Sequence, residues 1–134
     1  MKKKILIVDN DSELQFLFAQ ILGDAGHETC SLLDGELALE TIVKFRPDLI
    51  LLDVKIGNVD GRTLCKQVKE TPGMEVIPVI LVSAVDHLSA ALGHEGSPDE
   101  VIMKPFDLDH FLKTVRFFLK TSSNRQSGGM DHFS

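Results

Sequence analysis

Four polar side chains come directly after short apolar runs of this 134-residue chain. They are two carboxylates, a hydroxyl and an ammonium: Asp9, Asp53, Ser83 and Lys104. A carboxylate can attack phosphorus where its own charge and that of the phosphoryl oxygens are offset. Lys104 supplies a fixed cation for one phosphoryl oxygen, and the Ser83 hydroxyl can donate a hydrogen bond to another. These residue types favour an acyl phosphate, which we predict to form on Asp53.

The same carboxylates predict a Mg²⁺ site. This cation binds through one or two carboxylates together with phosphoryl oxygens and water, so Asp9 and Asp53 are its predicted protein ligands. Asp11 is a third acid nearby, but an Asp just before an amphipathic run is favoured as a helix N-cap over a metal ligand. No two of the five histidines have a ligand spacing such as HxxxH, and we predict that all lie at the surface or its boundary.

The elements that must position these side chains are strands and helices in alternation. The unbroken apolar run at 49–52 is typical of a strand buried on both faces of a parallel sheet. Strands are predicted at 5–8, 28–33, 49–52, 79–82 and 101–103, and helices at 14–22, 38–45, 64–68, 87–92 and 108–119. Such alternation predicts an α/β fold, a single doubly wound (βα)5 domain whose five-stranded parallel sheet has the flavodoxin-like order 2-1-3-4-5.

This strand order predicts one polar crevice. The first and third strands are neighbours at its switch point, and ligands bind outside the carboxyl ends of the strands there. Asp9 and Asp53 end those two strands, while Ser83 and Lys104 end the fourth and fifth. All four side chains are therefore expected at the same edge of the sheet.

Apolar residues recur at helical spacing in the first and the last predicted helix, and this pattern predicts which face of each helix points inward. The predicted inward residues of the first are Leu14, Leu17, Phe18, Ile21 and Leu22, and those of the last are Leu108, Phe111, Leu112, Val115, Phe118 and Leu119. Asp107 is the predicted N-cap of the last helix, and Phe106 is placed to form a hydrophobic staple with Phe111. Residues 1–120 are the predicted domain, and the Ser- and Gly-containing segment 121–134 is predicted to be a flexible tail.

Composition sets the remaining expectations. The net charge of -6 argues against a nucleic-acid surface, and no apolar run approaches the ~20 residues that span a bilayer. The segment MKKKILIVDND loses its apolar character too soon for a signal peptide, so a cytoplasmic location is expected. Cys30 and Cys65 have no CxxC spacing, and buried thiols are expected in place of a disulfide.

Four stretches together resemble a known family. The stretches ILIVDND, DLILLDVKIGNVDG, PVILVSA and VIMKPFD, in this order and at these separations, resemble the receiver domain of two-component response regulators over residues 1 to about 120. The resemblance implies that Asp53 is the phosphoacceptor, that Ser83 is the family's hydroxyl and that Lys104 is its lysine. It implies a Mg²⁺ site formed by Asp9, Asp53, Asn10 and the backbone carbonyl of Lys55, and a cis Lys104-Pro105 bond.

The chain departs from the family pattern close to the acceptor. Asn10 stands where a second acid is usual, so its amide can offer an oxygen but no charge. Lys55 follows the acceptor by two residues. Its ammonium could turn back toward Asp9 and Asp53, where a cation would sit, or it could point to solvent from the loop, as lysine usually does. Weak Mg²⁺ binding is therefore expected. The aromatic residue usual three positions before the lysine is Val101 here.

The resemblance implies a phosphoprotein of a phosphorelay. Its expected partners are a sensor histidine kinase or phosphotransfer protein and an unidentified downstream protein, with no membrane contact and no turnover of an external substrate. A degenerate receiver, acting as an interaction module without phosphorylation, is the first alternative. A haloacid dehalogenase-type phosphohydrolase needs a second Asp where Lys55 stands, and a flavin-binding protein needs a phosphate loop where NDSELQF stands.

Overall fold

The computed structural model describes residues 2–83, 96–104 and 106–131, with side chains through residue 120. Its elements in chain order are β1 (Lys4–Val8), α1 (Ser12–Asp24), β2 (Glu28–Leu32), the 3-10 helix η1 (Gly35–Leu37), α2 (Ala38–Phe45), β3 (Leu49–Leu52), β4 (Lys55–Ile56), β5 (Val59–Asp60), α3 (Gly61–Glu70), β6 (Val79–Ser83), β7 (Glu100–Met103) and α4 (Leu108–Asp131). The helix predicted at 87–92 and the Lys104-Pro105 bond lie outside the described residues.

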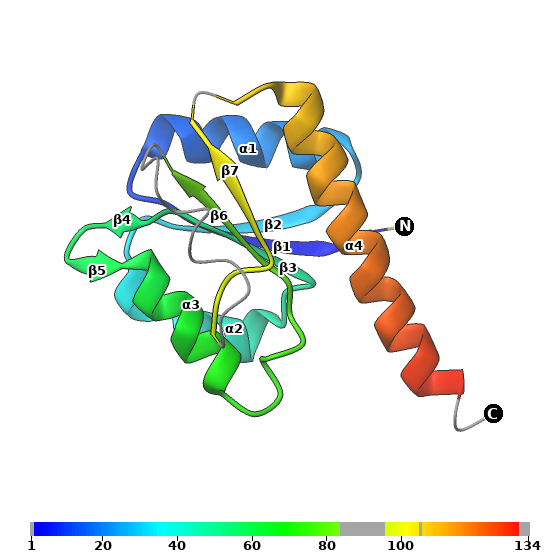
Figure 1. Cartoon of the computed structure of the whole chain (residues 1–134). Coiled ribbons are helices and arrows are strands. Elements are labelled where there is room, and N and C mark those ends of the chain that lie inside the picture. Colours follow the sequence, from blue (N-terminus) through cyan, green and yellow to red (C-terminus); the bar gives the residue numbers. More distant parts are fainter. Residues whose placement is uncertain (1, 84–95, 105, 132–134) are drawn as a thin grey trace.

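The main sheet has the predicted strand order. Its five strands pair in the order β2-β1-β3-β6-β7, and every pairing is parallel. Helices α1 and α4 cover one face of the sheet, and α2 and α3 cover the other (Figure 1). The doubly wound fold is thereby confirmed. Among the described residues, no helix combines the length and the apolar composition needed to cross a bilayer.

Strand alternation divides the core into two halves. Alternate residues of β3 point to opposite faces, so Leu49 and Leu51 pack with α1 and α4 while Ile50 and Leu52 pack with α2 and α3. All four are at most 1% exposed, as the unbroken apolar run predicted. The more polar β2 lies at the sheet edge, where one side of a strand needs no partner.

The N-termini of α1 and α4 are capped by the residues that the sequence predicted. Asp11 accepts hydrogen bonds from the backbone N–H groups of Glu13 and Leu14, which makes it the N-cap of α1. Asp107 accepts from the N–H of His110 in the first turn of α4. The rings of Phe106 and Phe111 lie 5.4 Å apart, confirming the staple at the entry to this helix.

The inward faces of α1 and α4 differ from the prediction by one residue each. Leu17 is 49% exposed, whereas the polar Gln15 is only 6% exposed, because the buried stripe of α1 runs through positions 15, 18 and 22. Leu108 is also exposed, since it is the first residue of α4 and its side chain tilts toward the helix N-terminus. The predictions that Leu17 and Leu108 point inward were wrong.

Two further segments differ from the expected elements. The loop predicted after Asp53 contains a short antiparallel hairpin, β4 paired with β5, which turns at Gly57 with a positive φ of 63°. Helix α4 continues to Asp131, past the expected boundary at residue 120. Extending an existing helix fixes one residue at a time and needs no new nucleus, and no proline interrupts this segment. The division into a domain and a tail stays a prediction.

Both cysteines are free thiols, as expected. Cys65 lies on the buried face of α3, and burial raises the pKa of its thiol to about 11. Cys30 is half-buried on β2 and packs against the same half of the core. The environment of Cys65 therefore disfavours a reactive thiolate, because the nucleophilic form of this residue is nearly absent at neutral pH.

Candidate functional site

The register of the central strands brings the two predicted carboxylates together. Val8 of β1 pairs with Leu52 of β3, so Asp9 and Asp53 are the next residues on adjacent parallel strands. The backbone N–H of Asp53 donates to the carbonyl of Val8 at 3.0 Å, which continues the ladder to the strand ends. The side chains of Asp9 and Asp53 are only 4% and 12% exposed.

Lys104 places its ammonium between these carboxylates. Its Nζ lies 3.8 Å from Oδ2 of Asp9 and 3.8 Å from Oδ2 of Asp53. Charge-assisted N–H to O bonds are shorter, about 2.7–2.9 Å, so these are ion pairs without a close hydrogen bond. The structure therefore joins the three charged residues predicted from separate strand ends.

Ser83 joins the same edge through the backbone. It is the last residue of β6, is 4% exposed and pairs in register with Met103 of β7. Its carbonyl accepts the backbone N–H of Lys104 at 2.8 Å. This bond holds the Lys104 backbone at the end of β6. The Ser83 hydroxyl and the Lys104 ammonium therefore extend from neighbouring strand ends.

Each carboxylate has one oxygen held by backbone and one directed to the lysine. Oδ1 of Asp9 accepts the N–H of Asp11 at 2.8 Å, and Oδ1 of Asp53 accepts the N–H of Val54 at 2.7 Å. In both cases Oδ2 is the atom closest to Lys104. The fixed Oδ1 atoms set the orientation, and the Oδ2 atoms are those available for chemistry.

The protonation of Asp9 reflects its burial. Burial raises the pKa of this carboxyl above its ordinary value of 3.8, and the charge of Asp53 adds to the increase. The N–H of Asp11 and the charge of Lys104 act in the opposite direction. Because the folded-state pKa exceeds the unfolded one, ionised Asp9 lowers the free energy of unfolding once the pH rises through that pKa. An acid buried at such a cost is typical of a functional site.

The donor set suits Mg²⁺. Two carboxylates plus carbonyl oxygens and water match the ligands this cation takes, whereas no group of three His, Cys, Asp or Glu able to hold a metal occurs in the described part of the chain. Asn10 and Lys55 are exposed beside the carboxylates. Within the described residues, the ion pairs of Asp9 and Asp53 go to Lys104 and none goes to Lys55. The cation between the carboxylates is thus Lys104, and of the two placements left open for Lys55 the exposed one is found.

Gly61 is a site residue that the sequence reasoning missed. It begins α3, donates its N–H to the carbonyl of Val54 at 2.6 Å, and packs directly on the Asp53 peptide. A Cβ at this position would overlap the Asp53 carbonyl oxygen and lie 2.8 Å from its carbon. The signal available in the sequence was a glycine after Asp60, which caps α3 by accepting the N–H of Arg62.

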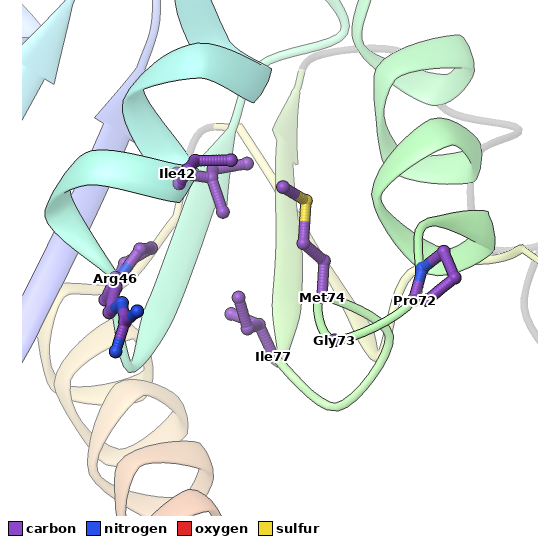
Figure 2. A pocket seen from close by; sticks show the side chains of 8 residues that line it. Ile42, Arg46, Pro72, Gly73, Met74 and Ile77 are labelled. Atoms are coloured by element: carbon purple, nitrogen blue, oxygen red, sulfur yellow. The ribbon is translucent and has the colours of Figure 1, made fainter.

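A second concavity lies at the opposite end of the sheet. Figure 2 shows the hollow, about 380 Å³ in volume, between the end of α2 and the loop that leads into β6. Its lining is mostly apolar and comprises Ile42, Val43, Arg46, Pro47, Pro72, Gly73, Met74 and Ile77. Arg46 is its one ionisable lining residue, so this hollow lacks the paired acids and the cation that Asp9, Asp53 and Lys104 provide at the other end of the sheet.

Comparisons with known proteins agree on one family. A family model described as "Response regulator receiver domain" matches residues 5–116. The DNA-binding response regulator MtrA of Mycobacterium tuberculosis (strain ATCC 25618 / H37Rv) is 32% identical over 92% of this chain and 54% of its own length. Sporulation initiation phosphotransferase F of Bacillus subtilis (strain 168) is 34% identical, covering 92% of this chain and 99% of that protein. The chain thus spans about half the length of the first curated relatives it matches.

Solved structures show the same likeness. A putative response regulator from Chloroflexus aurantiacus superposes with a TM-score of 0.81 at 31% identity, covering 90% of this chain and 99% of that one. The BeF3-activated N-terminal receiver domain of RstA from Klebsiella pneumoniae gives a TM-score of 0.76 at 30% identity, covering 87% and 97%. The match to the family model, over residues 5–116, includes the strands that carry the four polar residues.

Proposed function

Since this chain belongs to the family of response regulator receiver domains, we propose that Asp53 accepts a phosphoryl group from a histidine kinase or a phosphotransfer protein. The chain then signals through contact with another protein in a two-component phosphorelay. One observation carries the proposal: the Lys104 ammonium lies 3.8 Å from both Asp53 and Asp9 at adjoining strand ends. This arrangement holds a nucleophile, a second acid and a cation in one small volume.

The proposed step is a transfer between two nucleophiles. Oδ2 of Asp53 attacks phosphorus, a new O–P bond forms, and the bond from phosphorus to the donor's imidazole nitrogen breaks with its electron pair left on that nitrogen. Lys104 offsets charge on the phosphoryl oxygens, and the Ser83 hydroxyl is positioned on the adjacent strand end to donate to one of them. The bond from the Val54 N–H holds Oδ1 of Asp53 during this step.

Asp9, Asp53, Asn10 and the Lys55 carbonyl are the groups that would hold Mg²⁺, which when bound supplies positive charge against the phosphoryl oxygens. Asp9 is the only one of the four that is fully buried, and its ionised form is disfavoured by that burial. The role of this chain's own residues is therefore to hold the two carboxylates close together at the ends of β1 and β3. A site with one acid fewer than the family pattern is expected to bind the cation weakly.

A substitution series tests the metal part of the proposal. Asn10→Asp restores a negative charge, and a charge about 4 Å away contributes about 4 kcal/mol at an effective dielectric of about 20, before desolvation and screening reduce it. We expect Mg²⁺ to bind about tenfold more tightly, by titration calorimetry. Lys55→Ala should change the affinity little, because the Lys55 side chain is exposed and pairs with neither carboxylate. Tight wild-type binding that Asn10→Asp leaves unchanged would contradict the expectation.

Mass spectrometry of the intact protein tests the function directly. After incubation with Mg²⁺ and acetyl phosphate, the wild-type chain is expected to gain the mass of one phosphoryl group. A degenerate receiver is the second candidate, favoured by Asn10 in place of an acid, and it predicts no gain with this donor or with a phosphorylated kinase. The two candidates therefore give opposite results in one measurement.

The partners follow from the same proposal. The name of phosphotransferase F places that relative in phosphoryl transfer, and it is matched over nearly its whole length. The name of MtrA says that it binds DNA, but this chain matches only about half of it. For the residues present here, a cytoplasmic location and protein partners without nucleic acid remain our proposal, since the net charge of -6 disfavours a polyanion.

A further inference from the structure

A closed ring of hydrogen bonds surrounds the backbone of Asp9. Oδ1 of Asp9 accepts the Asp11 N–H at 2.8 Å, and the Asp11 carbonyl accepts the Gln15 N–H at 3.0 Å. The side-chain amide of Gln15 in turn donates to the carbonyl of Leu32. The same Leu32 carbonyl accepts the N–H of Asp9 at 3.0 Å, which closes the ring. Asp9 is thus held at both its backbone and its side chain.

Gln15 is the one member of this ring that contributes through an amide side chain from a helix. It lies on the buried face of α1 with Phe18 and Leu22, and it is 6% exposed. Its Nε2 also lies 3.4 Å from the carbonyl of Ile7, near the end of β1. A polar group buried in this place costs free energy unless its hydrogen bonds are made. Here those bonds go to the ends of the two strands that adjoin Asp9.

We propose that Gln15 is a positioning residue that holds Asp9 in the orientation the phosphoacceptor site requires. This deepens the proposed function, on which it rests. Gln15 itself touches neither Asp53 nor Lys104 among the contacts described for it; it acts through Leu32 and through the first turn of α1. Because its amide is neutral, it can fix the direction of the Asp9 carboxylate without altering the charge of the site.

The geometry explains why such a residue is needed. Oδ2 of Asp9 faces Lys104 only while Oδ1 stays bound to the Asp11 N–H. Asp11 begins α1 as its N-cap, so any shift of this helix along β1 and β2 moves the Asp11 N–H with it. The Gln15 side chain links α1 to the end of β2 and opposes that shift. Without this side chain, the link between α1 and the end of β2 depends on apolar packing, which is not directional.

Gln15→Met is the sharpest test, with Gln20→Met as its matched control. Methionine is unbranched, similar in length and a good helix former, but it donates no hydrogen bond. Gln20 is on the same helix and is exposed, so its replacement makes the same chemical change outside the ring. Gln15→Leu is a second variant for the case in which Gln15→Met folds poorly.

Site-resolved hydrogen exchange by NMR is the decisive measurement, with the Leu51 amide in the central strand as the reporter of global opening. In Gln15→Met, protection of the Asp9 and Asp11 amides relative to Leu51 is expected to fall about tenfold, which is the order of the effect of losing one hydrogen bond. Gln20→Met should leave these ratios unchanged. An equal loss at all three amides, or no loss, would overturn the proposal and leave Gln15 a structural residue.

The rate of phosphoryl uptake then separates this inference from the proposed function. Where the wild-type chain takes up a phosphoryl group, Gln15→Met is expected to do so several-fold more slowly at equal folded fraction, and an unchanged rate would overturn the positioning role. Where the wild-type chain takes up none, the proposed function fails. The exchange ratios still decide whether Gln15 orients Asp9.

Discussion

Asp53→Asn is expected to abolish phosphoryl uptake while leaving the fold intact. The amide is nearly isosteric with the carboxylate, and its oxygen can still accept the Val54 N–H that now holds Oδ1 at 2.7 Å. It lacks the charge and the nucleophilicity that attack on phosphorus requires. After incubation with Mg²⁺ and acetyl phosphate, the mass of the variant should stay at that of the unmodified chain, whereas the wild-type chain gains one phosphoryl group.

The matched control is Asp11→Asn. Asp11 lies in the same acidic segment, but its carboxylate caps α1, and asparagine is an equally good N-cap. This variant should take up a phosphoryl group as the wild-type chain does. Uptake by Asp53→Asn at the wild-type rate, or loss of uptake in Asp11→Asn with a normal unfolding transition, would show that the acceptor has been assigned to the wrong carboxylate.

Gly61→Ala, which adds one methyl group near the site, is expected to lower both the stability of the fold and the rate of phosphoryl uptake. The new Cβ would overlap the carbonyl oxygen of Asp53 and lie 3.0 Å from Cα of Val54, and both neighbours are backbone. The backbone of Asp53 and Val54 cannot move aside as a flexible side chain can. We therefore expect the free energy of unfolding, measured with urea, to fall by about 3 kcal/mol. Phosphoryl uptake should fall at the same time, because the displaced peptide carries the acceptor.

Gly23→Ala is the control for this substitution. Gly23 lies near the end of α1, and nothing is within 4 Å of the position its Cβ would take. Alanine there should be neutral or should stabilise by up to about 1 kcal/mol, because it favours the helix. A Gly61→Ala variant as stable and as readily phosphorylated as Gly23→Ala would contradict the close approach of α3 to the Asp53 peptide.

Much of the fold could be predicted from the sequence because its signals are local. The apolar run at 49–52 predicted a strand buried on both faces, and the helical periodicity before and after it predicted crossovers on both sides of a parallel sheet. The caps Asp11 and Asp107 and the Phe106 staple were predicted equally well, since each depends on residues at most a few positions apart. Candidate site residues could be named because each followed such a run.

The contacts between elements could not be predicted in this way. The sequence predicted Lys104 at the same edge of the sheet as Asp9 and Asp53, but it left open whether the Lys55 ammonium also lies there. The register of β1, β3, β6 and β7 places the Lys104 ammonium 3.8 Å from both carboxylates. In the sequence, Gly61 lies in the predicted loop after Asp53, and only the structure shows that it begins α3 and packs against the Asp53 peptide.

Gln15 shows most clearly what only the tertiary structure decided. By the sequence alone, a polar residue between Leu14 and Phe16 belongs to the solvent face of α1, and Leu17 belongs to the core. The helix is instead rotated so that Gln15 is buried and Leu17 is exposed. The physical reason is that a buried amide is stable only where carbonyl oxygens can accept its hydrogens, and residues near the ends of β1 and β2 supply them. Periodicity determines that a helix has an inner face, whereas the partners across the interface determine which residues occupy it.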